Sequence, residues 1–168
     1  MTGPDRPGAL VDDGTDAPRL YWGSGSQVAV RLTAADTRGQ VGVTHFVAAA
    51  GEAAPLHRHH HEDELFLVAR GEVELTVDGA TRVVGGGGLA YLPRGSAHRY
   101  TVLADRSEFF VATLPGGFER FFATAGLDPA LLDTDPAAVW SRERTAEIER
   151  SLGTGLEWLT TSLPKEQH

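Results

Sequence analysis

Cysteine is absent from this chain of 168 residues. Its absence excludes a disulfide framework, a catalytic thiolate and a thiolate metal site. A metal ion bound here must therefore be held by imidazole, carboxylate or backbone oxygen. Lysine is nearly absent too, since Lys165 is the only one, and the formal net charge is −8. Phosphate backbones need clustered positive charge, which the sequence lacks, so we expect no nucleic-acid partner.

Long apolar runs are also missing. No stretch approaches the ~18 apolar residues of a membrane-spanning helix. Residues 1–18 are rich in Gly, Pro and Asp and contain no apolar segment of the kind found in a signal peptide. Hydrophobic residues make up 41% and charged residues 23%, which are ordinary values for a globular protein. We expect a cytoplasmic protein with no membrane partner.

Alternating apolar and polar residues dominate the chain from residue 20 to residue 114. In residues 72–77, Val73, Leu75 and Val77 occupy every second position, which is the period of a half-buried strand. Asp78-Gly79 then suits the positive φ angles of a tight hairpin turn. The other expected strands are 27–33, 40–47, 81–84, 89–92, 98–103 and 108–113. Short strands without intervening helices predict an all-β antiparallel sandwich or barrel.

Helical spacing replaces this alternation after Pro115. Residues 117–125 place three phenylalanines on one helix face. A second helix is expected over 136–152, with Gly153 as its stop. The chain is therefore divided into a flexible N-terminal arm, a barrel, and a C-terminal helical extension packed on that barrel, at residues 1–18, 19–116 and 117–168.

Four histidines fall within a short segment, at His57, His59, His60 and His61. His57 and His59 share one face of a strand, because side chains alternate along it. Glu64 follows closely, so the two imidazoles and the carboxylate are expected to converge from adjacent strands. With His98 they form a candidate metal set, suited to one divalent ion of Fe, Mn, Ni, Co, Cu or Zn. His60 and His61 are expected in the following turn, facing solvent.

Spaced glycines frame these residues. The segment from Gly51 to Gly71 follows G-x5-H-x-H-x4-E-x6-G, and the segment from Gly87 to His98 follows G-x5-P-x-G-x2-H. Glycine suits turns where a side chain would be strained. The two patterns resemble the two conserved motifs of the cupin superfamily, and the chain resembles a small bacterial monocupin. The resemblance implies a double-stranded β-helix, or jelly-roll, barrel. Val102 departs from the family, where the second motif usually ends in Asn.

A finer resemblance connects the chain with quercetin dioxygenase-like cupins. The resemblance rests on short sequence segments at 21–23, 63–64, 92–95, 115–119 and 155–157. It implies a metal-dependent enzyme acting on a small oxygenated aromatic or polyketide-like substrate, most simply as a quercetinase-like dioxygenase that uses O2. Two alternatives remain open: a non-oxidative cyclase or isomerase of natural-product biosynthesis, and a non-catalytic small-ligand-binding cupin. The family also implies a homodimer formed through edge strands, with residues 1–18 as a candidate for exchange.

Individual roles follow from these patterns. Glu64 is the candidate catalytic residue, because a carboxylate beside a divalent cation can accept a proton from substrate. His45 alternates with valines, which is typical of a core histidine, although a place in the pocket remains open. Aromatic residues near the motif strands most often fill the core, and Tyr100 is the leading candidate for a pocket wall. The candidate substrate-binding residues are Tyr100, Phe46, Phe66, Tyr91 and Phe109.

Overall fold

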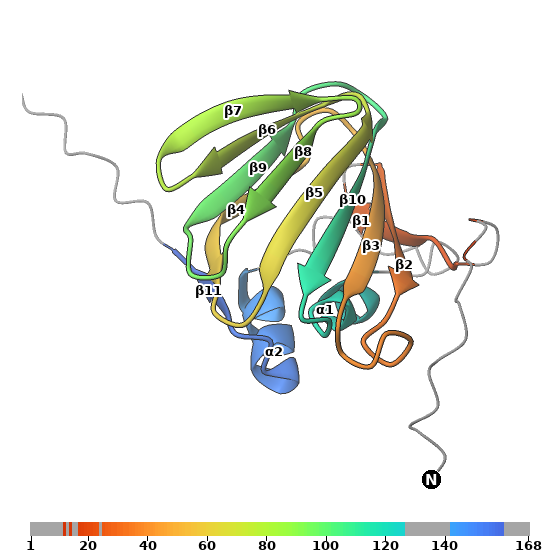
Figure 1. Ribbon diagram of the computed structural model, residues 1–168, viewed down its shortest axis with the longest axis vertical. Helices are drawn as coiled ribbons and strands as arrows, with labels where there is room; N and C mark the ends of the chain where they lie inside the picture. Colours follow the sequence, from red (N-terminus) through yellow and green to blue (C-terminus); the bar gives the residue numbers. More distant parts are fainter. Residues whose placement is uncertain (1–11, 13, 15–16, 24, 127–141, 160–168) are drawn as a thin grey trace, which may run out of the picture.

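Two antiparallel sheets face each other in the computed structural model (Figure 1), which describes residues 12, 14, 17–23, 25–126 and 142–159. The six-stranded sheet has the order β1-β2-β3-β10-β5-β8. Its strands are β1 (Leu20–Gly23), β2 (Ser26–Leu32), β3 (Gly42–Ala48), β10 (Ser107–Leu114), β5 (Asp63–Arg70) and β8 (Leu89–Leu92). The five-stranded sheet has the order β11-β4-β9-β6-β7. Its strands are β11 (Leu156–Trp158), β4 (Ala53–His59), β9 (His98–Val102), β6 (Glu72–Val77) and β7 (Ala80–Gly85).

Consecutive strands from β3 to β10 pass repeatedly between the two sheets. The chain leaves β4 in one sheet, enters β5 in the other, and returns to the first for β6 and β7. The predicted hairpin between β6 and β7 is confirmed, with φ of 46° at Asp78 and 83° at Gly79. The all-β cupin jelly roll predicted from the sequence is thereby confirmed.

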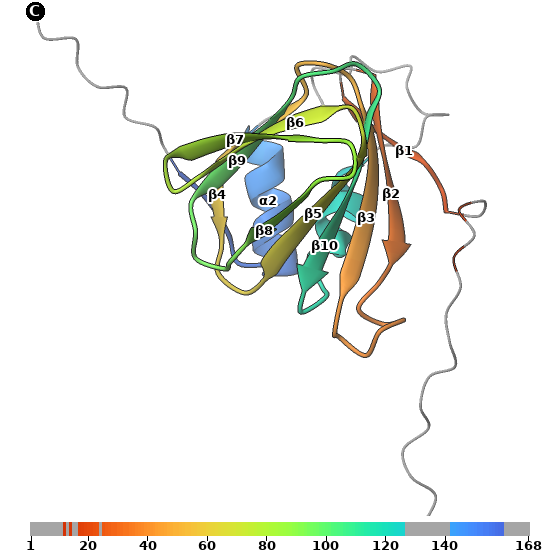
Figure 2. The same ribbon diagram turned by 45° about the horizontal axis from the view of Figure 1, so that its top comes forward.

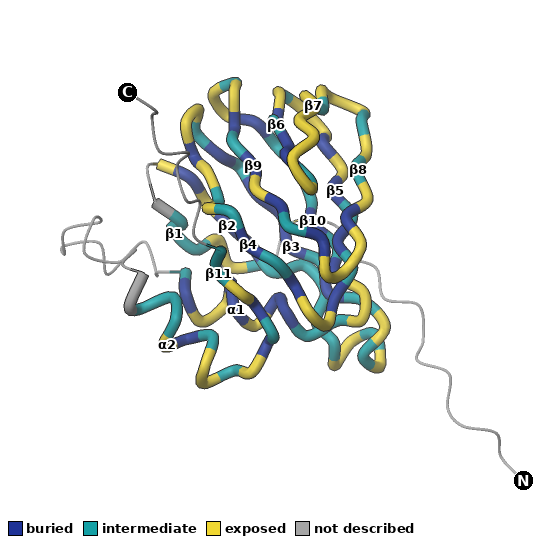
Figure 3. The backbone as a smooth tube through the Cα atoms, turned by 90° about the vertical axis from the view of Figure 1, so that its left-hand side faces the viewer, coloured by how far each residue is buried: buried dark blue, intermediate teal, exposed yellow. Residues whose placement is uncertain are grey.

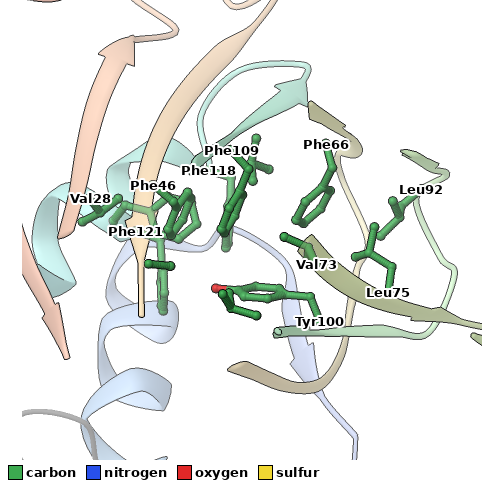
Figure 4. Close-up of a cluster of buried hydrophobic side chains, with 14 of the residues drawn as sticks. Val28, Phe46, Phe66, Val73, Leu75, Leu92, Tyr100, Phe109, Phe118 and Phe121 are labelled. Carbon is green, nitrogen blue, oxygen red and sulfur yellow. The ribbon is translucent and has the colours of Figure 1, made fainter. Parts of the chain in front are cut away.

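The inner faces of the two sheets form the core. Phe46 of β3 and Phe109 of β10 stack with ring centroids 4.8 Å apart, and both are almost fully buried. Figure 4 shows these rings beside Phe66 and Tyr100 within one cluster. By contrast, β7 is exposed over nearly its whole length, as Figure 3 shows.

His45 lies on the outer face of the six-stranded sheet. It stacks on Phe110, with ring centroids 4.4 Å apart, and its Nε2 lies 2.9 Å from Glu108 Oε1. Phe46, the next residue, points inward instead. The alternating valines and histidine of residues 40–47 thus lie on the outer face of the sheet. The possibility that His45 lines the pocket beside the metal motifs is wrong. The inward residues of this strand are Thr44, Phe46 and Ala48. Because they are a polar, an aromatic and a small residue, the sequence pattern did not identify them as the core-facing side of the strand.

Two helices lie together at one end of the sandwich (Figures 1 and 2). The first, α1 (Glu119–Ala125), packs against α2 (Arg142–Leu152), β2 and β3. The helix expected over 117–125 is confirmed, and Gly153 ends α2 with a φ of 61°. The expected beginning of the second helix, at 136–141, lies outside the described residues.

The C-terminal extension is not wholly helical, because β11 follows α2 and pairs with β4. The expected arm at 1–18 lies almost entirely outside the described residues, so its flexibility stays a prediction. A single chain does not test the homodimer, which also stays a prediction. In the described ranges, neither helix has the length and apolarity needed to cross a membrane.

The motif glycines allow a test of the fold. Gly71 has a φ of 82°, and a side chain there would meet Ser107, whose Cα lies 2.7 Å from the Cβ position. Gly51 has a similar φ of 87°, but its Cβ position is open. A left-handed conformation costs a non-glycine residue about 1–2 kcal/mol, and overpacking adds about 1–3 kcal/mol. Gly71→Ala should therefore lower the free energy of unfolding, measured in urea, by clearly more than Gly51→Ala. Equal losses would contradict the close approach to Ser107.

Candidate metal centre

His57 and His59 project from β4 into the space between the sheets. They are two residues apart on one strand and therefore share its inner face. Both are buried, with exposed fractions of 7% and 1%. His98, at the beginning of β9, lies directly opposite His57 in the register of the five-stranded sheet. Three imidazoles thus come together from one sheet.

Glu64 reaches the same point from the opposite sheet. It belongs to β5, which pairs with β8 and β10 and not with β4. Its Oε2 lies 2.9 Å from Nε2 of His98, and its Oε1 lies 3.5 Å from Nε2 of His59. The predicted convergence is therefore observed, but the expectation of adjacent strands is wrong, because the cluster bridges the two sheets.

Backbone carbonyls orient two of the rings. Nδ1 of His57 lies 2.7 Å from the Pro55 carbonyl oxygen, and Nδ1 of His98 lies 3.1 Å from that of Ser96. A carbonyl oxygen only accepts hydrogen bonds, so each Nδ1 must be the protonated nitrogen that donates. In the neutral form of each ring the lone pair then sits on Nε2, which faces the cluster. Such a bond on the outer nitrogen is typical of metal-binding histidine.

The four side chains fit one metal ion. One donor atom from each lies within 4.8 Å of the others, and all four residues are buried. Donors about 2.1 Å from a shared ion stand up to about 4.2 Å apart, so a small contraction brings them into range. Nε2 of His59 and Nε2 of His98 are buried without a hydrogen-bond partner of good geometry in the described part of the chain. Buried polar atoms normally have partners, and a cation would satisfy both.

The charges of the cluster match a cation. Burial raises the pKa of Glu64, but His59 and His98 outweigh burial, and the pKa falls to about 2. Burial, together with neighbouring His98, lowers the pKa of His57 to about 3. The carboxyl is thus ionised and the His57 ring is neutral at physiological pH. These are the protonation states that Glu64 and His57 need as metal ligands. Burial lowers the pKa of His59, but Glu64 and Glu62 outweigh burial and raise it, so metal binding would have to displace a proton from this ring.

An apolar cavity of about 190 Å³ opens beside the cluster. His57, His59 and Glu64 form part of its wall, and so do the predicted residues Phe46, Phe66 and Tyr100. Side chains from the C-terminal part of the chain complete the wall, among them Phe118, Phe121, Leu156 and Trp158. The metal ligands are therefore the main ionisable groups that an enclosed ligand would meet.

Two of the predicted substrate-binding residues lie elsewhere. Phe109 is fully buried and stacks behind Phe46 without lining the cavity. Tyr91 is 60% exposed and points outward from the edge strand β8, so its placement in the pocket is corrected. The alternation along 89–92 did not reveal which face pointed inward. His60 and His61 face solvent as predicted, and His60 Nε2 lies 2.8 Å from Glu157 Oε2.

Three neighbours of the cluster escaped the sequence analysis. Glu62 is buried, with Oε2 3.8 Å from Nδ1 of His59. Phe118 packs edge-on against His59, and Trp158 lies 5.4 Å from His57 between ring centroids. The acidic residues after the histidine run were a signal for Glu62. No sequence pattern connects Trp158 with His57, because their contact depends on the pairing of β11 with β4.

Fold and site together define a β-sandwich with a buried candidate metal centre. The family model described as "Cupin domain" matches residues 44–111, and this part of the chain is a cupin domain. Quercetin 2,3-dioxygenase of Bacillus subtilis (strain 168) is 33% identical over 76 residues, which are 45% of this chain and 23% of that protein. The matched region is thus less than a quarter of that relative's length.

Solved structures share the fold at low sequence identity. KdgF from Halomonas sp. superposes with a TM-score of 0.58 and 16% identity, over 64% of this chain and 94% of that one. The polyketide cyclase RemF from Streptomyces resistomycificus superposes with a TM-score of 0.50 and 20% identity, over 64% of this chain and 78% of that one. These likenesses establish the architecture alone.

Metal analysis tests the ligand set. The wild-type protein, loaded and then desalted, should retain about one divalent ion per chain. His57→Ala and His59→Ala should lose it, because each removes one of four donors from a single ion. His60→Ala, next to His59 in the sequence but outside the cluster, is the matched control and should keep the ion. Full retention in both cluster variants, measured by elemental analysis, would contradict the assignment.

Glu62 provides a finer test of the same site. Loss of the carboxylate beside a metal-binding histidine typically weakens metal affinity about 10- to 100-fold. Glu62→Gln should therefore weaken metal affinity by this factor, as measured by competition with a chelator. Glu157→Gln, beside solvent-facing His60, should leave the affinity unchanged. Equal affinities in the two variants would remove Glu62 from the site.

Proposed function

We propose that this protein is a metal-dependent cupin enzyme acting on a small, oxygenated and largely aromatic substrate. One observation carries the proposal: His57, His59, His98 and Glu64 direct their donor atoms to one buried point at the wall of an apolar cavity. Buried ionisable groups that converge in a cavity are typical of functional sites.

The four residues would hold a divalent ion, which would supply Lewis acidity and, for a redox-active metal, reactivity with O2. The chain's own part is to bind and orient the substrate beside them. Glu64 is ionised and has two oxygens facing the cluster, so it is placed to take the proton of a substrate hydroxyl. The phenylalanine and tryptophan side chains exclude water from the reacting atoms.

Cavity size bears on the substrate. An apolar cavity of about 150 Å³ holds benzene. The volume of about 190 Å³ here therefore encloses one substituted ring or a compact bicyclic compound. The rest of a larger substrate would extend beyond the enclosed volume. A mostly apolar wall with a few polar groups suits an aromatic compound bearing oxygen substituents.

Ring-opening dioxygenation is the first candidate reaction. It is supported by the likeness to the Bacillus quercetin 2,3-dioxygenase, which is 33% identical over 76 residues. In such a step both atoms of O2 enter the organic product, and one ring carbon leaves as carbon monoxide. Glu64 would take the proton of the substrate hydroxyl before O2 reacts with the ring.

A non-oxidative cyclase or isomerase is the second candidate. The modest cavity favours it, because a three-ring flavonol exceeds the enclosed volume and a smaller enolisable substrate does not. The same carboxylate would then move a proton within the substrate, without oxygen. A ligand-binding cupin without catalysis is the remaining alternative.

Oxygen consumption tests the ring-cleaving candidate. Protein loaded in turn with Fe, Mn, Co and Ni is mixed with quercetin, and O2 uptake and carbon monoxide are recorded. We expect turnover with at least one metal in the wild type and in His60→Ala, and none in His57→Ala. Product formed without O2 uptake would move the assignment to the cyclase or isomerase. Absence of turnover with every metal would remove the ring-cleaving candidate.

A further inference from the structure

Tyr100 gives the cavity a second polar position, separate from the metal ligands. It lies on β9 two residues after His98, on the same face and about 7 Å further along the strand. Its ring lines the cavity, and only 8% of the residue is exposed. Figure 4 shows its hydroxyl oxygen directed toward Phe46 and Phe121.

Glu52 stands behind this hydroxyl. Oη of Tyr100 donates a hydrogen bond to Glu52 Oε1 at 2.8 Å. Glu52 is itself buried, with an exposed fraction of 8%, and its Oε2 has no hydrogen-bond partner of good geometry among the described residues. The backbone pairing of Glu52 with Val102 fixes its position just before β4. A buried carboxyl is costly, and neither the metal centre nor the sheet pairing requires this one.

The direction of this hydrogen bond decides what Tyr100 can recognise. A tyrosine hydroxyl has one proton and two lone pairs. Because its proton is given to Glu52, the hydroxyl can only accept hydrogen bonds from the cavity side. Trp22, which also lines the cavity, donates to this hydroxyl, so one of the two lone pairs is left for a ligand. A ligand hydroxyl can donate to that acceptor, whereas an ether or a carbonyl oxygen cannot.

We propose that Tyr100, oriented by Glu52, forms a second binding subsite that accepts a hydrogen bond from a phenolic hydroxyl of the substrate. The subsite deepens the proposed function and rests on it, since it assumes that an oxygenated aromatic ligand occupies the cavity beside the metal centre. The substrate class is then an aromatic compound with at least two oxygen substituents. One faces the cluster of His57, His59, His98 and Glu64, and the other faces Tyr100.

The ionisation of Glu52 agrees with this role. Burial raises the pKa of Glu52 to about 7, against hydrogen bonds from Tyr100 and Trp22 that lower it. Above neutral pH the ionised Glu52 has no proton to donate, so the proton in the hydrogen bond between the two side chains belongs to Tyr100.

Calorimetry with naphthalene probes tests the subsite at pH 8 on protein loaded with zinc, which does not support redox turnover. The 1,5-, 2,6- and 2,7-dihydroxynaphthalenes are compared with 1- and 2-naphthol and with the corresponding methoxynaphthols. We expect at least one diol to bind about five- to tenfold more tightly than its naphthol and its methoxy analogue, as one hydrogen bond allows. Failure of every diol to gain affinity would overturn the subsite.

Variants assign that gain to its residues. Tyr100→Phe should abolish the preference for the diol while binding naphthol as the wild type does, whereas Tyr91→Phe, on the exposed face, should keep the preference. Glu52→Gln can turn an amide N–H toward Tyr100 and free its proton, so the ratio between hydroxyl and methoxy ligands should fall. A preference that survives in Tyr100→Phe contradicts the proposal, and an unchanged ratio in Glu52→Gln contradicts the orienting role.

These outcomes are independent of the reaction. The zinc-loaded protein reports binding alone, so loss of the diol preference in Tyr100→Phe supports the subsite even where oxygen assays find no ring cleavage. Conversely, turnover of quercetin by a protein with no diol preference would support the proposed function and remove the subsite. Thermal unfolding of Tyr100→Phe and Glu52→Gln, measured alongside, confirms that each variant is folded before its affinities are compared.

Discussion

The ionised carboxylate of Glu64, buried between two sheets, is the constraint on which the rest of the site depends. Removing such a charge from water costs several kcal/mol unless close partners compensate. Here compensation comes from imidazoles on the opposite sheet, at 2.9 Å from His98 and 3.5 Å from His59. The geometry thus requires β4, β9 and β5 to hold fixed positions across the sandwich. A divalent cation at the same point would complete the balance of charge.

Sequence spacing was sufficient to predict this cluster, because two regularities act locally. Side chains alternate along a strand, which puts His57 and His59 on one face, and the glycines at 51, 71, 87 and 95 all have the positive φ that suits tight turns. Neither regularity states which sheet a strand joins. The expectation that Glu64 would come from a neighbouring strand failed for that reason, since β5 pairs with β8 and β10.

The remaining misses share one physical cause, which is that tertiary packing decides inward and outward faces. The alternation at 40–47 suggested that His45 and the valines face the core, yet it is Thr44 and Phe46 that do so. Tyr91 lies outward for the same reason. The short strand β11 carries no strong pattern of its own and is stabilised by pairing with β4. Through that pairing Leu156 and Trp158 complete the cavity wall, so a segment far along the chain helps to determine what the metal centre can bind.

Anomalous diffraction at the absorption edge of the bound metal tests the central claim most directly. From crystals of the manganese- or nickel-loaded protein, the account predicts one strong peak per chain. That peak should lie about 2.0–2.2 Å from Nε2 of His57, His59 and His98 and from a carboxylate oxygen of Glu64. A peak elsewhere, or no peak in crystals grown with excess metal, would contradict the metal centre and leave the chain as a cupin fold without the chemistry assigned to it.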